Sequence, residues 1–358
     1  MSEHHPVIVI GAGLSGLYAA WRLHRQQVDV LVLEARSRVG GRILSEKPEG
    51  HESAIDLGPA WIWPAFQQRM RALVNELGIP LFSQYTRGDL LFETETGDVQ
   101  RHGGPSSHDQ SFRIAGGKAA LIDALCSQLP ESSVQTGITV RSIRRDAMQV
   151  EAEGAEGPVL YSADRVILAL PPRLLLNNID LIPEPDETMQ RVWRDTPTWM
   201  AGHEKRVFIY EDPFWRSQGL SGEVFSRRGP LSEIYDGSPE GEDFYALTAF
   251  VGLSAMQRQQ LAQDMLHEAC MAQLLRLFGQ VSSDVRQVMV SDWSTESLTT
   301  TGLDLDSMAH HPQYPATMQR HLWDERLLLA GTEVAREQGG YLEGALEAAD
   351  EATAFILA

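Results

Sequence analysis

The sequence predicts an α/β fold, in which a parallel sheet covered by helices is interrupted by a second, inserted domain. In "HPVIVIGAGLSGLYAAWRL" a buried strand, a glycine turn and a helix follow one another. A second apolar strand comes at once in "VDVLVLE", which completes a βαβ unit. Strands of the same kind return near the end of the chain, so we expect the first domain to be discontinuous.

The remaining elements follow from hydrophobic spacing and turn residues. Helices are expected at about 65–77, 116–129 and 254–278, the last one ending at Gly279. The helix expected at 65–77 has an apolar face formed by Phe66, Met70, Leu73, Val74 and Leu77. A hairpin is expected around Gly97. Strands are expected in "ITVRSIRR", "MQVEAE", "VLYSA" and "RVILALPP".

The second half of the chain predicts an antiparallel sheet and a final helix. The sheet strands are "KRVFIYE", "GEVFS", "SEIYD" and "FYALTAFVG", followed by strands near 285–293 and 327–330. The final helix keeps helical spacing through Leu342, Leu346, Ala349, Ala352 and Ile356. Gly339-Gly340-Tyr341 stands at its start, although glycine costs helix stability.

Charge and composition exclude several classes of function. The chain has 358 residues, 49 acids against 30 lysines and arginines, and a net charge of −19, which repels nucleic acid and anionic membranes. No apolar run approaches the roughly 18 residues of a membrane span. A strand expected from Pro6 leaves no place for a signal peptide. Cys126 and Cys270 have no metal-site spacing, so we expect buried thiols, no metal and a cytoplasmic protein.

The first glycine turn has the spacing of a dinucleotide-binding loop. Gly11 permits the tight turn, Gly13 lets the backbone approach a pyrophosphate, and Gly16 allows close packing of helix and strand. Glu34 follows at a strand end, where its carboxylate can accept hydrogen bonds from ribose hydroxyls. A packing turn is the alternative, but strand, helix and acid together favour a dinucleotide.

A second glycine pair favours FAD over NAD. In "EARSRVGGR", Gly40 and Gly41 add another close backbone approach, and Arg42 adds a guanidinium for phosphate charge. An NAD-dependent dehydrogenase would need neither this segment nor the final helix.

With these motifs the sequence resembles the flavin-containing amine oxidase family, which includes monoamine and polyamine oxidases. The blocks that carry the resemblance occur in order along the whole chain: "GAGLSGL", "LEARSRVGGR", "DLGPAWIWP", "AGGKAALIDAL", "ITVRSI", "RVILALPP", "EKRVFIYEDPFW" and "AGTEVAREQGGYLEGALEAA". The resemblance implies a Rossmann-like FAD-binding domain of the glutathione-reductase type (1–79, 108–175 and 290–358). It also implies an α+β substrate domain on an antiparallel sheet (80–107 and 176–289).

The resemblance also implies roles for particular residues. The residues implied to be catalytic are Lys205, Tyr341 and Trp61. The residues implied to bind FAD are Gly11, Gly13, Leu14, Ser15, Gly16, Glu34, Ala35, Arg36, Gly40, Gly41, Arg42, Gly58, Pro59, Ala60, Trp61, Val140, Gly331, Glu333, Gly340, Tyr341 and Leu342. FAD is expected to be non-covalent, because Gly302 stands where some members carry the attaching cysteine.

The sequence departs from the family pattern at the aromatic pair that faces the flavin. Tyr341 matches one wall, but Gly302 and Leu303 stand where the other is expected. Candidate substitutes, each also open to a core-packing role, are Trp61, Trp199, Phe214 and Phe250.

Three further expectations concern the access to the site and its substrate. Only about thirty residues follow Gly78 where the family carries a longer segment, which predicts a trimmed lid. Trp61 stands where the amino-acid oxidase branch has an arginine, so the substrate is expected to lack an α-carboxylate unless Arg87 or Arg113 supplies the charge. A solvated loop is expected to carry His310 and His311.

The activity implied is oxidation of a primary or secondary amine to an imine by hydride transfer to flavin N5. The imine then hydrolyses to an aldehyde, and O2 is reduced to H2O2. The implied partners are the amine and O2, in a monomer or homodimer. Two alternatives stay open at this point: an FAD-dependent desaturase or dehydrogenase of a non-amine substrate, and a degenerate flavin-binding protein.

Overall fold

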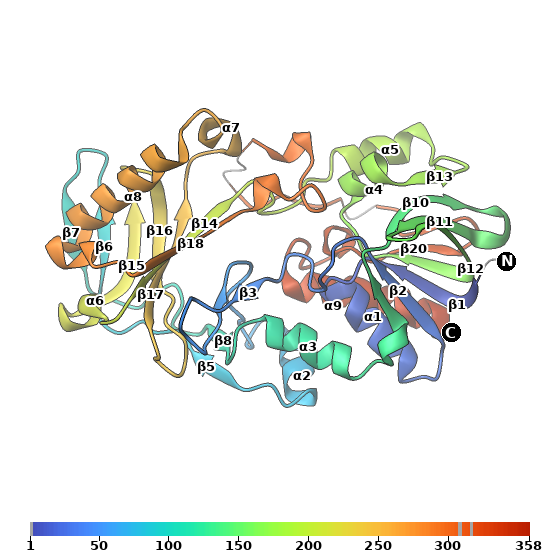
Figure 1. The fold of residues 1–358 in the computed structure, drawn as a ribbon, viewed down its shortest axis with the longest axis horizontal. Coiled ribbons are helices and arrows are strands. Elements are labelled where there is room, and N and C mark those ends of the chain that lie inside the picture. Colours follow the sequence, from blue (N-terminus) through green and yellow to red (C-terminus); the bar gives the residue numbers. More distant parts are fainter. Residues whose placement is uncertain (1–2, 307–309, 316–317) are drawn as a thin grey trace.

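The computed structural model describes residues 3–306, 310–315 and 318–358 as two lobes side by side, each built on one large sheet (Figure 1). Both ends of the chain lie in the lobe that carries α1 (Leu14–His24) and α9 (Leu342–Leu357). This arrangement confirms the predicted fold class.

The first sheet has nine strands and joins both ends of the chain. Its main path is β13 (Asp180–Ile182), β10 (Thr139–Arg144), β11 (Gln149–Gly154), β12 (Gly157–Leu168), β1 (Glu3–Ile10), β2 (Val30–Glu34) and β9 (Val134–Thr136). β20 (Leu327–Leu329) pairs with β12, and β19 (His321–Leu322) pairs with β20. β1 is parallel to both β2 and β12, as the βαβ pattern predicts. The two strands expected within 157–168 form the single strand β12.

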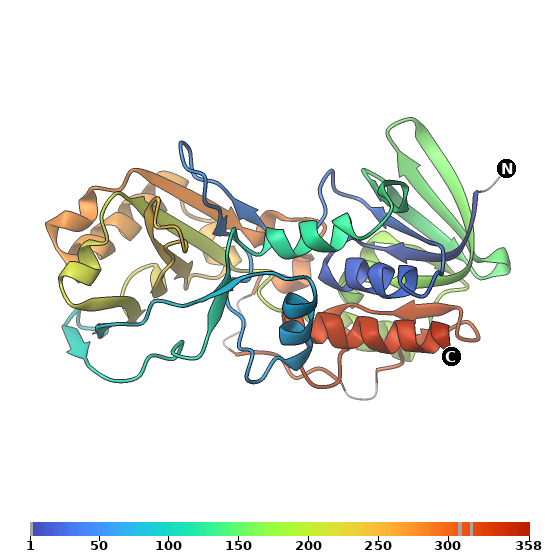
Figure 2. The same cartoon turned by 90° about the horizontal axis from the view of Figure 1, so that it is seen from below.

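Helices cover both faces of this sheet (Figure 1), and Figure 2 shows α1 and α9 in front, seen from below. One core lies under α1, α2 (Gln68–Glu76), α3 (Ala119–Ser127) and α9. On the other face, α4 (Pro172–Asn178) and α5 (Glu187–Arg194) cover a second core, into which Trp193 is buried. Short 3-10 turns connect elements at η1 (Glu131–Ser133), η2 (Asp146–Met148) and η3 (Gln280–Ser283).

The second sheet has seven strands. Its path is β18 (Gln287–Asp292), β14 (Glu204–Tyr210), β17 (Tyr245–Val251), β16 (Leu231–Asp236), β15 (Leu220–Ser226), β6 (Asp89–Glu93) and β7 (Val99–His102). β14, β17, β16 and β15 pair antiparallel as predicted, whereas β6 pairs with β15 in parallel. β6 and β7 form the hairpin predicted around Gly97. One face packs against α6 (Phe214–Ser217) and α8 (Gln263–Phe278). Two small ladders, β3 (Ser45–Glu46) with β4 (Ile55–Asp56) and β5 (Leu81–Ser83) with β8 (Phe112–Ile114), lie between the lobes.

Two helix predictions were wrong in detail. The helix expected from residue 65 begins at Gln68, and Phe66 is 69% exposed rather than buried. The cause is a turn in which the amides of Phe66 and Gln67 donate to the Trp63 carbonyl, which points Phe66 outward. The helix expected over 254–278 is two helices, α7 (Ala255–Arg258) and α8. The buried Arg258 side chain holds α7 against Glu204 and Asp292, away from the line of α8.

The domain limits drawn from the sequence stay a prediction. Two strands lie near these limits: β13 pairs with β10 in the first sheet, and β18 pairs with β14 in the second.

Of the two cysteines, Cys270 is buried as expected, whereas Cys126 is only partly buried.

Candidate functional site

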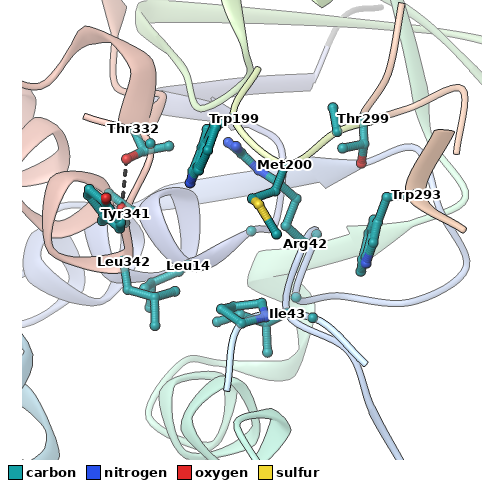
Figure 3. A pocket seen from close by; sticks show the side chains of 18 of the residues that line it. Leu14, Arg42, Ile43, Trp199, Met200, Trp293, Thr299, Thr332, Tyr341 and Leu342 are labelled. Atoms are coloured by element: carbon teal, nitrogen blue, oxygen red, sulfur yellow. Dashed lines mark hydrogen bonds between the residues drawn. The ribbon is translucent and has the colours of Figure 1, made fainter. Parts of the chain in front are cut away.

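A cavity of about 330 Å³ lies where the two lobes meet, and segments from both ends of the chain line it (Figure 3). Eighteen residues expected at the site line it: Gly11, Gly13, Leu14, Ser15, Glu34, Arg36, Gly40, Gly41, Arg42, Gly58, Pro59, Ala60, Trp61, Lys205, Gly331, Gly340, Tyr341 and Leu342. Four others do not line it: Gly16, Ala35, Val140 and Glu333. Val140 belongs to the core of the first sheet, Gly16 packs against Gly11, and Glu333 binds the lining residue Arg42.

The glycines of this wall are required by close backbone approach. Gly11 has a φ of +101°, and a Cβ on Gly16 would lie 1.9 Å from the Gly11 carbonyl oxygen. Gly13 and Gly41 face each other so closely that a Cβ on Gly41 would lie 3.2 Å from the Gly13 Cα. α1 starts here without a side-chain cap or an acid in its first turn. Its free N–H groups and positive dipole end therefore suit a pyrophosphate.

Glu34 lies at the end of β2 and is held there by backbone amides. Its carboxylate accepts from the Ala12 N–H at 2.8 Å and from the Arg36 N–H at 2.9 Å. The Arg36 guanidinium donates to Glu296 at 3.1 Å and to Thr299 at 2.8 Å, and its Nη1 lies 3.9 Å from Glu34 Oε1. Since each carboxylate oxygen has a second lone pair, Glu34 can also accept hydrogen bonds from ribose hydroxyls.

An ion pair at the cavity joins a segment near the start of the chain to one near its end. The Arg42 guanidinium donates to Glu333 Oε1 at 2.7 Å, and Glu333 is fully buried. Burial alone would lower the pKa of Arg42, but the Glu333 carboxylate outweighs it and raises that pKa. Within the described residues, Glu333 Oε2 has no hydrogen-bond partner. A buried carboxylate oxygen needs a donor, and a ribityl hydroxyl would supply one. The phosphate cradle, the strand-end acid and this orphaned oxygen together fit FAD.

The start of α9 is built from two glycines and two stacked rings. A Cβ on Gly339 would lie 2.4 Å from the Tyr314 ring. Gly340 has a φ of +80°, and its Cβ would lie 3.0 Å from His311 Nε2. His311 stacks on Tyr341 with ring centroids 4.5 Å apart and an angle of 3°. His311 Nε2 lies 2.8 Å from the Gly339 carbonyl, so the expectation of a solvated loop was wrong for this histidine.

Residues 56–60 form a wall whose carbonyls are held by buried side chains. Lys205 Nζ donates to the Asp56 carbonyl at 3.2 Å and to the Gly58 carbonyl. Trp293 Nε1 donates to the Leu57 carbonyl at 3.1 Å. Burial lowers the pKa of Lys205 to about 7. The charge of Asp56 raises this pKa but offsets only part of the effect of burial. Lys205 is therefore a buried amine at the cavity that is poised to change its charge near neutral pH.

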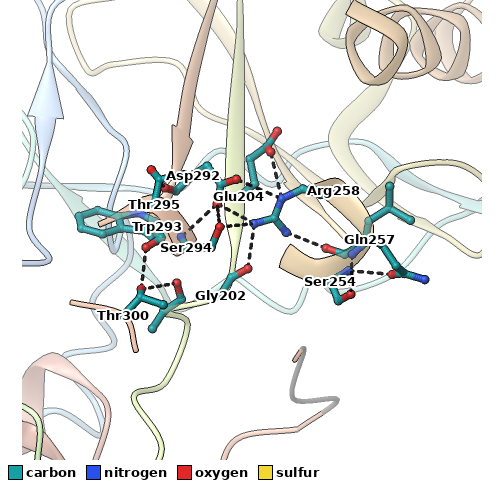
Figure 4. Close-up of polar contacts among 12 residues, drawn as sticks. Gly202, Glu204, Ser254, Gln257, Arg258, Asp292, Trp293, Ser294, Thr295 and Thr300 are labelled. Carbon is teal, nitrogen blue, oxygen red and sulfur yellow. Dashed lines mark hydrogen bonds and ion pairs between the residues drawn. The ribbon is translucent and has the colours of Figure 1, made fainter. Parts of the chain in front are cut away.

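A buried arginine joins the strand that carries Lys205 to the end of the strand that precedes Trp293 (Figure 4). Arg258 donates to Asp292 at 2.6 Å and to the Gly202 carbonyl at 2.9 Å, and pairs with Glu204 at 3.1 Å. Asp292 ends β18 and caps η4 (Trp293–Thr295), while Glu204 begins β14. Arg258 thus fixes the backbone next to both side chains.

Aromatic side chains line the far end of the cavity. Trp61, Trp63, Trp199 and Phe250 line it together with Tyr341. Trp61 is oriented by a hydrogen bond from its Nε1 to Gln84 at 2.8 Å. Its ring centroid lies 4.5 Å from that of His108, 5.0 Å from that of Tyr235 and 6.2 Å from that of Phe250.

Of the candidate substitutes for the missing aromatic wall, Phe214 was wrong. It packs in the core of the second sheet against Tyr210, Trp215 and Phe278. Gly302 and Leu303 lie on η5 (Gly302–Asp304), and neither lines the cavity.

Neither candidate for binding a substrate carboxylate reaches the cavity. Arg87 is exposed, and the buried Arg113 donates to the Ser238 carbonyl at 2.8 Å. The formally charged lining residues are Glu34, Arg36, Arg42 and Lys205. Arg36 pairs with Glu296 and Arg42 with Glu333, whereas Lys205 has no ion pair among the described residues.

Several residues that line the cavity were not predicted from the sequence. Trp63 stands in the "WIWP" block, where only Trp61 was singled out, and Gln67 follows three residues after that block. Thr332 stands between Gly331 and Glu333, which were both expected at the site. Met200, His203, Leu298 and Thr299 also line the cavity, from segments without a local motif.

The segment expected as a trimmed lid contains no helix among its described residues, 78–111. This segment contains β5, which pairs with β8 in a small ladder, and the hairpin β6–β7, which forms one edge of the second sheet.

The described residues hold no group of three or more His, Cys, Asp or Glu side chains arranged for a metal ion. None of the described helices is both long enough and apolar enough to cross a membrane.

Comparison with known proteins identifies similar sequences and folds. Residues 104–357 match the model of the flavin containing amine oxidoreductases, and residues 9–77 match that of an NAD(P)-binding Rossmann-like domain. The chain is 23% identical to a probable flavin-containing monoamine oxidase A of Dictyostelium discoideum, over 97% of this chain and 96% of that one. That alignment runs over 449 positions, so the relative carries residues without a counterpart here.

Solved structures show the same fold. Putrescine oxidase with bound putrescine superposes with a TM-score of 0.84 at 21% identity, over 100% of both chains. Cyclohexylamine oxidase from Brevibacterium oxydans superposes with a TM-score of 0.81 at 18% identity, over 98% of both chains.

Proposed function

Because the chain belongs to the family of flavin-containing amine oxidoreductases, we propose that its substrate is a monoamine with an apolar group and no α-carboxylate. The chain is an FAD-dependent amine oxidase. The observation that carries the choice of substrate is the composition of the cavity beyond the dinucleotide end. There the lining is aromatic and Lys205 is its only formally charged residue among those described.

Bound FAD would supply the chemistry by taking the hydride from the α-carbon of the amine and passing the electrons to O2, which leaves as H2O2. The chain would hold the pyrophosphate at the start of α1, the adenosine ribose at Glu34 and the ribityl chain at Glu333. The Arg42–Glu333 pair joins the segments that form these positions. FAD binding is non-covalent in this proposal, since the described wall of the cavity contains no cysteine.

The aromatic end would orient the amine and keep water away. Trp61, Phe250 and Tyr341 offer apolar ring faces to the carbon skeleton of the substrate. In such a dry site the ammonium form is disfavoured, which promotes the neutral amine whose lone pair hydride transfer needs. A substrate carboxylate would enter this end without an arginine to pair with, at a cost of several kcal/mol.

The sequence left two alternatives open, a desaturase and a degenerate flavin-binding protein. Membership of the flavin-containing amine oxidoreductase family supports amine oxidation instead.

The test is a matched pair of substrates that differ only in the α-carboxylate. With 2-phenylethylamine we expect H2O2 and an aldehyde to form in equal amounts. With phenylalanine we expect kcat/KM to be lower by about 100-fold or more, because its carboxylate would be buried unpaired. A diamine such as 1,4-diaminobutane serves as a third compound, since the aromatic end has no acid for a second ammonium. Turnover of phenylalanine or of the diamine as fast as that of phenylethylamine would contradict the proposed substrate class.

A further inference from the structure

The chain contains three lysines among its 358 residues, and two of them are buried and bind one backbone segment of the cavity wall. Lys47 is exposed and pairs with Glu52 on the surface. Lys118 is fully buried, and Lys205 is 3% exposed. Arginine therefore supplies nearly all the surface cations, while two of the three lysines stand where a cation is costly.

Both buried lysines bind the same short segment of backbone. Lys118 Nζ donates to the Ala60 carbonyl at 2.7 Å, and Lys205 Nζ donates to the carbonyls of Asp56 and Gly58. Gly58 and Ala60 are two residues apart, a span of at most about 7 Å along an extended chain. The charge of Lys118 acts on Lys205, so two ammonium groups on this segment would repel each other.

The surrounding charges do not balance two ammonium groups. Asp56, Arg113 and the two lysines themselves are the charged groups that act on this pair. Asp56 Oδ1 already accepts from the Ser45 hydroxyl at 2.6 Å and from the Lys118 N–H at 2.7 Å. Among the described residues, Asp56 Oδ2 and Arg113 Nε have no hydrogen-bond partner. One carboxylate thus faces three potential cations, of which the guanidinium of Arg113 is always charged.

We propose that Lys118 is a positioning residue for Lys205: it takes the ammonium form on this wall, so that Lys205 remains a neutral amine at the aromatic end of the cavity. The assignment rests on the proposed amine oxidation for its purpose, because Lys205 lines the cavity and Lys118 does not. Burial lowers the pKa of Lys118 to about 8 and that of Lys205 to about 7, and the charge of Lys118 contributes to the lowering at Lys205.

A neutral Lys205 would assist a substrate that arrives as an ammonium ion. It does not repel the positive charge, and its lone pair can accept the proton. The N–H bond of the substrate ammonium breaks, a new N–H bond forms at Nζ, and the substrate is left as the neutral amine. No electrons are transferred in this step. With Lys118 apolar, Lys205 would be protonated to a higher pH and would lose this role near neutrality.

The low number of lysines makes a direct test practical. Lysine labelled with 13C at Cε gives three signals in NMR spectra of the FAD-loaded enzyme, and the shift of each reports its protonation. The variants Lys47→Met, Lys118→Met and Lys205→Met assign the three signals by their loss. Lys205 is expected to titrate near 7.

The decisive comparison is the Lys205 signal in different variants. In Lys118→Met we expect its midpoint to rise by about one pH unit, a tenfold change in the proton affinity. Lys118→Arg keeps a cation and should leave the midpoint low, and Lys47→Met is the matched control without effect. A merely structural role for Lys118 would not distinguish methionine from arginine in this way. An unchanged or lower midpoint in Lys118→Met would overturn the proposal.

A second variant covers the case in which Lys118→Met does not fold. Lys118→Gln keeps an N–H donor for the Ala60 carbonyl and removes the charge, so the Lys205 midpoint should rise as in Lys118→Met, and an unchanged or lower midpoint would overturn the proposal. The readout needs no substrate. If no amine reduces the flavin while the Lys205 midpoint behaves as expected, the proposed function fails and the assignment of charge stands.

Discussion

The Arg42 guanidinium lies 2.7 Å from the Glu333 carboxylate, although 291 positions separate the two residues in the sequence. The contact joins the glycine segment after the first βαβ unit to the turn before the last helix. Both ends of the chain must therefore be folded together before the cavity exists.

Replacing Glu333 by glutamine should weaken FAD binding. The amide keeps the size of the side chain but removes the charge opposite Arg42 and one acceptor for the cofactor. We expect the dissociation constant of FAD to rise by about 10- to 100-fold, the value of one or two hydrogen bonds to a charged group. Quenching of flavin fluorescence on binding measures it. Glu52→Gln, which removes an exposed ion pair with Lys47, is the control and should bind FAD as the wild type does. Equal affinity in the two variants would speak against a role for Glu333.

Alanine at Gly16 should disrupt the dinucleotide loop, whereas alanine at Gly302 should not. A Cβ on Gly16 would lie 1.9 Å from the Gly11 carbonyl oxygen, while a Cβ on Gly302 meets nothing within 4 Å. We expect Gly16→Ala to lower the free energy of unfolding by about 1–3 kcal/mol or more and to lose FAD on gel filtration. Gly302→Ala should keep both properties. FAD retained by Gly16→Ala would contradict the assigned phosphate site.

The ring of Tyr341, rather than its hydroxyl, should matter for the substrate. Burial raises the pKa of Tyr341, so the hydroxyl stays neutral at working pH. Tyr341→Phe keeps the stack on His311 and should leave KM close to the wild-type value. Tyr341→Ala removes the ring, and KM should rise several-fold to about tenfold, as expected for one aromatic contact. Steady-state assays with 2-phenylethylamine compare the two, and equal KM values would argue against Tyr341 as a cavity wall.

The buried lysines should make the protein more stable as the pH rises. In the folded chain they lose their protons near pH 7 and 8, whereas in the unfolded chain lysine titrates near 10.4. Between these values the unfolded state binds more protons, so stability increases with pH by up to about 1.4 kcal/mol per unit for each neutral lysine.

Urea unfolding at pH 7.5 and at pH 9.5 measures this gain. The double variant Lys118→Met with Lys205→Met should lose most of the gain, and Lys47→Met should keep it. The same pH dependence in the wild type and the double variant would show that the two lysines are charged in the folded protein.

Local patterns were sufficient to predict the dinucleotide end of the site. Gly11, Gly13 and Glu34 lie within one βαβ unit, where spacing along the chain determines spacing in the fold. The match of the final segment placed Glu333 and Tyr341 near them, because both belong to blocks with a distinctive sequence.

The aromatic end could not be predicted in the same way, because it is assembled from distant segments. Trp199 and His203 come from a connection without a helical or strand pattern, and Thr299 follows a short 3-10 turn. His311 was assigned to a solvated loop, since nothing in its surroundings shows that it stacks on Tyr341. The role proposed for Lys118 could not be predicted from the sequence either. A lysine beside a glycine pair at a helix start is typical of a solvated position, and only the fold shows that it is fully buried.

The most direct test of the central claim is the visible spectrum of the FAD-loaded protein during anaerobic addition of 2-phenylethylamine. An FAD-dependent amine oxidase should show flavin bands that remain with the protein on filtration, separate from it on denaturation, and bleach when the amine is added. Readmission of O2 should restore the bands and produce H2O2. Bands that no amine of any class bleaches, or a protein that cannot be loaded with FAD, would contradict the account.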